Sequence, residues 1–98
     1  MSNNKEQELQ IKMPEGLSPV FSNAARVLHS DDEFSLHFAQ TIPGTNRAEA
    51  KAIVSLTPSH AKRLLKAIER EIQDFESKFG EIELPEEPGS KEKPDYVG

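Results

Sequence analysis

A run of basic side chains is the feature of this chain best suited to chemistry. It forms the only basic stripe of the sequence and lies in the first half of a predicted helix, where free backbone N–H groups also attract anions. We predict that the run contacts an anion or an acidic partner, with a solvated helix face as the plain alternative. Its members are His60, Lys62, Arg63, Lys66 and Arg70.

The remaining histidines do not complete a catalytic or metal-binding set. His29 is followed by Asp31, Asp32 and Glu33, and this acidic grouping is typical of a hairpin turn as well as of a metal site. The chain has no phosphate-binding loop, no glycine-rich dinucleotide motif, no HExxH zinc motif and no serine in a nucleophile elbow. The sequence therefore predicts no catalytic residue, no metal, no cofactor and no enzyme activity.

One long amphipathic segment, residues 57–79, positions the basic run. Thr57 is a good helix cap, Pro58 suits the first helical position, and Gly80 suits the end. Apolar residues recur at alternating spacings of four and three, which predicts an apolar stripe of the heptad type. The stripe consists of Ala61, Leu65, Ile68, Ile72, Phe75 and Phe79.

The charges of this helix oppose its dipole, since basic residues fill the first half and acidic residues dominate the second. Three explanations fit this pattern. The first is an anion held near the helix start. The second is an antiparallel partner helix that sets each basic half against an acidic half. The third is a solvated face stabilised by local pairs such as Arg70–Asp74 and Asp74–Lys78.

Short strands precede the helix, in residues 8–13, 20–29, 33–42 and 48–56. Turns at Asp31–Asp32 and around Thr45 align the last three strands so that both hairpins bury the same face. The register pairs are His29–Phe34, Val27–Leu36, Ala25–Phe38, Phe34–Leu56, Leu36–Val54, Phe38–Ala52 and Gln40–Ala50. The opposite, open face is either solvated or a contact surface, and it includes Arg26, His37, Lys51 and Ile53.

These elements predict an α+β fold, a three- to four-stranded antiparallel β-meander with one long C-terminal helix packed on one face. A helix of about 33 Å exceeds a strand length of about 26 Å, so its distal end overhangs the sheet. The overhang carries Ile72, Phe75 and Phe79, and we predict that a second copy of the chain buries them. The alternative is that Ile82 and Leu84 fold back as an edge strand and cover them.

Length and composition define one small domain. The 98 residues allow a single domain over residues 8–84, with disordered ends in 1–7 and 85–98, where Tyr96 and Val97 form a possible docking motif. A net charge of −5 disfavours a general nucleic-acid binder. The chain has no cysteine, which fits a reducing cytoplasm, and no apolar run long enough to cross a membrane.

Three stretches resemble a family of small bacterial and archaeal proteins, the domain of unknown function 3467 family. They are residues 21–38, FSNAARVLHSDDEFSLHF, residues 56–68, LTPSHAKRLLKAI, and residues 79–82, FGEI. The resemblance covers residues 8–84 and implies a small α+β protein of the cytoplasm without known catalytic residues. It also implies that His60, Lys62 and Arg63 in the HAKR stretch matter for function.

The function expected from the sequence is that of a non-enzymatic homodimeric interaction or scaffold protein, with a second copy of the chain and an unidentified protein as the expected partners. The second hypothesis is a protein that binds nucleic acid or another polyanion through the basic first half of the helix.

Overall fold

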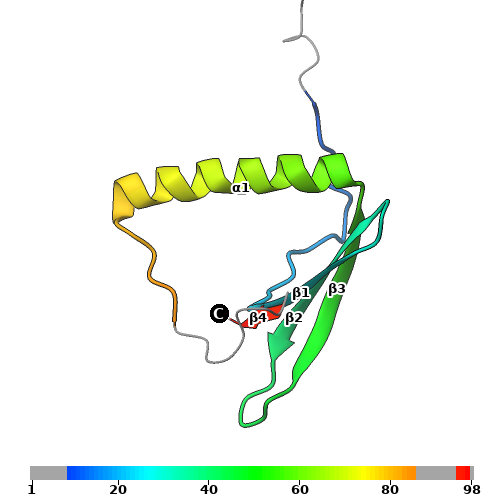
Figure 1. Ribbon diagram of the computed structural model, residues 1–98, viewed down its shortest axis with the longest axis vertical. Coiled ribbons are helices and arrows are strands. Elements are labelled where there is room, and N and C mark those ends of the chain that lie inside the picture. The colour runs from blue at the N-terminus through cyan, green and yellow to red at the C-terminus, as the bar shows by residue number, and fades with distance from the viewer. Residues whose placement is uncertain (1–8, 86–94, 98) are drawn as a thin grey trace, which may run out of the picture.

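The computed structural model describes residues 9–85 and 95–97, and it has an α+β fold as predicted (Figure 1). Strands β1 (Ala24–His29), β2 (Phe34–Thr41) and β3 (Ala48–Leu56) form an antiparallel meander, and helix α1 (Pro58–Phe79) follows at once. A short strand β4 (Asp95–Val97) completes a sheet of strand order β3-β2-β1-β4. The bounds of β3 and α1 are those predicted.

The predicted registers of the two hairpins are confirmed up to one irregularity. Val27 pairs with Leu36, and Leu36 pairs with Val54. The register then shifts between Phe38 and Ala39, so that Lys51 is an extra residue and Ala50 lies opposite Ala39. Such a β-bulge reverses the facing of the residues beyond it. The predicted pair Gln40–Ala50 is therefore wrong, and Ala50 belongs to the open face.

Side-chain hydrogen bonds explain why β1 begins later than the predicted residue 20. The Ser22 hydroxyl donates to the carbonyl of Ala39 at 3.0 Å. The Asn23 side chain accepts from the Thr41 N–H at 3.0 Å and donates to its hydroxyl at 3.2 Å. These bonds replace the strand ladder at this end of the hairpin, because serine and asparagine side chains compete with backbone pairing.

The fourth strand comes from the opposite end of the chain from the one predicted. The described part of the predicted strand 8–13, residues 9–13, is not a strand, and Leu9, Ile11 and Met13 are exposed. Instead, three residues of the predicted disordered tail pair with β1, and Tyr96 lies opposite Ala25. The open edge of β1 offers unpaired backbone groups that an extended tyrosine–valine segment can satisfy. The predicted disordered residues 1–7, and most of 85–98, lie outside the described residues.

Helix α1 has the predicted termini. The Thr57 hydroxyl accepts from the N–H of His60 at 3.2 Å, and Pro58 occupies the first turn. At the other end Gly80 has φ 103°, and its N–H donates to the carbonyl of Glu76 at 3.0 Å. Cap and stop residues thus fix this helix locally, independently of what it packs against.

The helix does not pack along the sheet, contrary to the prediction. Thr57 is extended, with φ −70° and ψ 156°, as residues before proline tend to be. From this corner α1 runs away from the sheet (Figure 1), and within the described residues it makes only isolated contacts with the strands. No residue of α1 is buried. Among the described residues, the buried apolar side chains are Ala24, Ala25 and Leu56, all in the sheet.

Candidate interaction surfaces

The apolar stripe of α1 is open to solvent over most of its length. Leu65 is 57 % exposed, Phe75 47 % and Phe79 73 %, and Ile68 and Ile72 are similar. The Phe75 and Phe79 rings contact each other with centroids 5.0 Å apart, but nothing in the described residues encloses them. Large apolar side chains in one contiguous stripe are typical of an interaction surface. The predicted dimer contacts Ile72, Phe75 and Phe79 are thus accessible.

The segment after the helix covers part of this stripe without forming the alternative edge strand. The N–H of Ile82 donates to the Glu76 carboxylate at 3.0 Å, which holds Ile82 near the last turns of α1. A shallow apolar groove results, lined by Ala67, Ile68, Glu71, Ile72, Phe75 and Ile82. Residues 80–85 contain no strand, and Leu84 is 85 % exposed. The Phe79 end of the stripe therefore stays uncovered.

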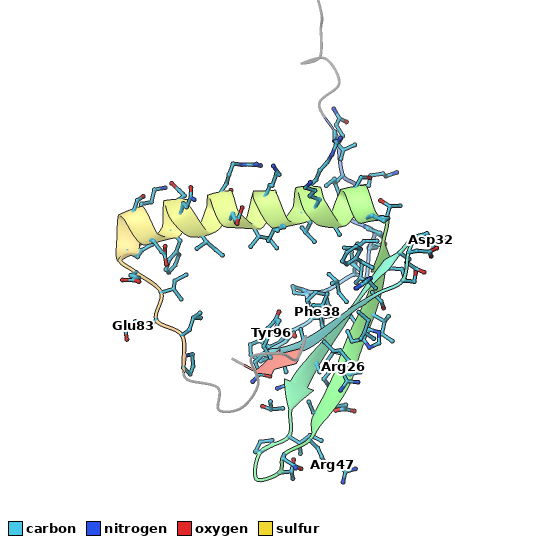
Figure 2. All side chains as sticks on the ribbon, in the orientation of Figure 1. Arg26, Asp32, Phe38, Arg47, Glu83 and Tyr96 are labelled. Atoms are coloured by element: carbon cyan, nitrogen blue, oxygen red, sulfur yellow. The ribbon has the colours of Figure 1, made fainter. Side chains whose placement is uncertain are left out.

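The predicted apolar face of the sheet is also incompletely covered. Phe38 and Tyr96 lie on the side of the sheet that faces α1 (Figure 2), and their register partner is the same residue, Ala25. Val54 on this face is 39 % exposed. Val20 from the N-terminal segment lies near Phe38 and Ala52. One chain thus carries two apolar surfaces, one on α1 and one on the sheet.

The basic run occupies the face of α1 opposite the apolar stripe. Successive residues of a helix turn by about 100°, so Lys62, Lys66 and Arg70 align on one side and Arg63 lies next to them. All four are exposed, and none forms an ion pair within the described residues. The predicted pair Asp74–Lys78 is present at 3.2 Å. His60 is exposed, and its backbone rather than its ring completes the helix cap.

The open face of the sheet brings together three of its four predicted residues in one row. Arg26 pairs with His37, and His37 pairs with Ile53, across all three strands of the meander. Lys51 stands at the bulge and forms an ion pair with Glu49 at 3.4 Å. The alanines around the bulge leave a shallow hollow that the sequence did not predict, because it depends on the register shift. Its lining includes Ala24, Arg26, His37, Ala39, Ala48 and Ala50.

The histidines are engaged in local contacts. The His29 ring lies against Phe34, with centroids 5.6 Å apart, and its Nδ1 is 3.1 Å from the Ser30 carbonyl. His37 Nε2 is 2.9 Å from the Ser35 hydroxyl. In residues 9–85 and 95–97, no three His, Asp or Glu side chains come together as a metal site would require. The same residues contain no helix with the length and hydrophobicity of a membrane span.

Comparison with known proteins agrees with the resemblance noted in the sequence. A family model described as a protein of unknown function, DUF3467, matches residues 1–84. No curated protein and no solved structure matches the chain significantly. The matched region includes the meander, all of α1 and the groove-forming Ile82. The chain therefore belongs to the DUF3467 family.

Proposed function

We propose that this protein is a non-enzymatic interaction protein that works as a homodimer, as a scaffold for further partners. The observation that carries the proposal is the exposure of both apolar surfaces of one chain, the stripe of α1 and the sheet face. A chain that folded as a complete monomer would bury these surfaces against each other. Because the two surfaces lie apart in one chain, we infer that a second copy buries the stripe of α1.

The areas involved suit a dimer. Phe75 and Phe79 are 47 % and 73 % exposed, and at about 200 Å² for each aromatic side chain they present roughly 240 Å² per copy. Leu65, Ile68 and Ile72, each about half exposed, add to this area. A stable interface buries about 800 Å² per partner, which the stripe approaches before the sheet face is added. Small domains also often gain stability by association, because their own cores bury too little surface.

Concentration-dependent thermal unfolding tests the proposal. A dimer is favoured by mass action, so its melting temperature rises with protein concentration. For a hundredfold increase we expect a rise of about 5–10 °C in melts followed by circular dichroism. A melting temperature independent of concentration would contradict the proposal, because unfolding of a monomer does not depend on concentration.

A second function, polyanion binding by the basic run, is favoured by one specific observation. Arg63, Lys66 and Arg70 lie on the face of α1 that dimerisation through the stripe would leave free, and Lys62 lies at the border of that face. No ion pair within the described residues neutralises them. Such a surface can bind the phosphates of a single-stranded oligonucleotide by counterion release.

Fluorescence anisotropy with a labelled single-stranded oligonucleotide tests this second function. We expect binding that weakens steeply with salt and is lost in Lys62→Glu plus Arg63→Glu. The control, Lys12→Glu plus Arg47→Glu, makes the same change in net charge at exposed sites outside α1. Equal binding losses in both double variants would reject the basic run as the site.

A further inference from the structure

We infer that α1 pairs with α1 of a second copy in antiparallel orientation, stripe against stripe, about a two-fold axis that crosses the seam at the level of residue 70. This inference rests on the proposed homodimer and specifies its interface. The occupant of the exposed stripe is thus the same stripe from another molecule. An isologous contact of this kind closes on itself and yields a dimer rather than a filament.

The spacing of the stripe is the first argument. It reads four, three, four, three, four in either direction, so the stripe is symmetric about residue 70. An antiparallel copy centred there places every stripe residue opposite another stripe residue, and it sets the smallest member against the most exposed phenylalanine. The expected contacts across the axis are Ala61–Phe79, Leu65–Phe75 and Ile68–Ile72.

The side-chain sizes at the ends of the stripe favour this direction. Phe79 is 73 % exposed and would meet Ala61, the smallest residue of the stripe, so a large side chain lies opposite a small one at both ends of the seam. Interfaces that alternate large and small side chains fill space without voids. A parallel pair would instead stack Phe79 on Phe79 and Ala61 on Ala61, which leaves the Ala61 end poorly filled.

Charges beside the stripe agree with the antiparallel direction at its ends and oppose it at its centre. Lys62 would lie beside Glu76 of the second copy, a favourable pair that occurs twice. Glu69 would lie near its own copy, where like charges repel. Glu69→Gln is therefore expected to lower the dissociation constant of the dimer, and a higher dissociation constant would count against this register.

The free edge of β3 is the competing route to a dimer, since an unpaired strand can join the same strand of another copy. Two features of β3 oppose this route. The bulge at Lys51 interrupts the edge, and Glu49 and Lys51 place charges along it. Bulges and charges of this kind are common devices that block edge pairing.

Disulfide cross-linking tests the geometry, and the chain is well suited to it because it contains no cysteine. In Leu65→Cys plus Phe75→Cys, the two thiols of one helix are about 15 Å apart, which exceeds the Cα separation of about 4.4–6.8 Å that a disulfide allows. Any disulfide must then join two copies. We expect oxidised glutathione to convert the double variant mainly to covalent dimer, and neither single variant to cross-link.

A second pair and a matched control make the result independent of one substitution. Ala61→Cys plus Phe79→Cys should behave like the first pair. Lys66→Cys plus Gln73→Cys is nearly symmetric about the same axis but lies on the opposite face of α1, so it should not cross-link. Cross-linking of the single variants would show a parallel pair and overturn the inference.

Light scattering of the unmodified chain separates this inference from the proposed function. A dimeric mass together with no cross-linking of either stripe pair would reject the antiparallel α1 pair and keep the homodimer. A monomeric mass of 11.0 kDa would reject both.

Discussion

Replacing the two distal phenylalanines of α1 should abolish association and leave the fold intact. Phe75 and Phe79 are 47 % and 73 % exposed, so at about 200 Å² per side chain they leave roughly 240 Å² open in each copy. Burial of this area is worth about 6 kcal/mol per copy at about 25 cal/mol per Å². If only half of this area is buried in the dimer, each copy contributes about 3 kcal/mol and the two copies together about 6 kcal/mol. The double variant Phe75→Ser plus Phe79→Ser should therefore raise the Kd of the dimer by about four powers of ten.

Sedimentation velocity measures this loss, and circular dichroism reports the fold of the same sample. We expect the variant to sediment as a monomer at concentrations where the unmodified chain is dimeric. Its helical signal should persist, because Phe75 is about half exposed and Phe79 mostly exposed in the isolated chain. The control, Lys66→Ser plus Gln73→Ser, makes two changes on the opposite face of α1 and should leave the dimer unchanged.

A variant that remains dimeric would refute the reasoning, since it would show that the distal stripe contributes nothing to association. A variant that unfolds would refute it differently, because it would mean that these rings belong to a core within one chain.

Three further predictions concern the elements that hold these surfaces in place. Thr57→Ala removes the cap hydroxyl bonded to the His60 N–H and should lower the free energy of unfolding, measured with urea, by about 1 kcal/mol. The control Ser59→Ala should lower it less, and equal losses would show that the Thr57 hydroxyl does not stabilise the helix start. Gly80→Ala forces alanine to φ 103° with no steric clash nearby, so we expect a loss of about 1 kcal/mol from backbone strain alone; unchanged stability would refute this. Asn23→Ala deletes both side-chain bonds to Thr41 and should lower the free energy of unfolding by about 1–2 kcal/mol. The control Asn46→Ala, in an exposed loop, should lower it little. Equal losses in the two variants would contradict the role of Asn23.

The local elements could be predicted from the sequence because their signals are local. The cap, the first-turn proline and the terminal glycine predicted α1 to the residue. Alternating side chains predicted the β1–β2 register throughout and the β2–β3 register only on the side of the bulge away from the turn, from Phe34–Leu56 to Phe38–Ala52. The sequence does not predict the bulge at Lys51, since the small alanines at positions 48, 50 and 52 carry little facing preference that would reveal a register shift. For the same reason Ala50 was assigned to the wrong face.

The long-range arrangement could not be predicted in the same way. The pairing of Tyr96 with Ala25 joins residues from distant parts of the chain. It depends on the unpaired edge of β1, which exists only once the sheet has formed. The apolar stripe of α1 indicated that something covers it but not whether the cover is the chain's own sheet or another molecule. Of the predicted sites, the stripe and the basic run lie on opposite faces of α1. Three of the four open-face residues, Arg26, His37 and Ile53, form one row across the sheet, and Lys51 lies at the bulge.

The central claim is that the exposed stripe of α1 is covered by a second copy of the chain. Light scattering coupled to size-exclusion chromatography, repeated over a dilution series of the unmodified protein, tests it most directly. We expect twice the chain mass of 11.0 kDa at high concentration, with dissociation only on strong dilution. A mass of one chain at every concentration would contradict it.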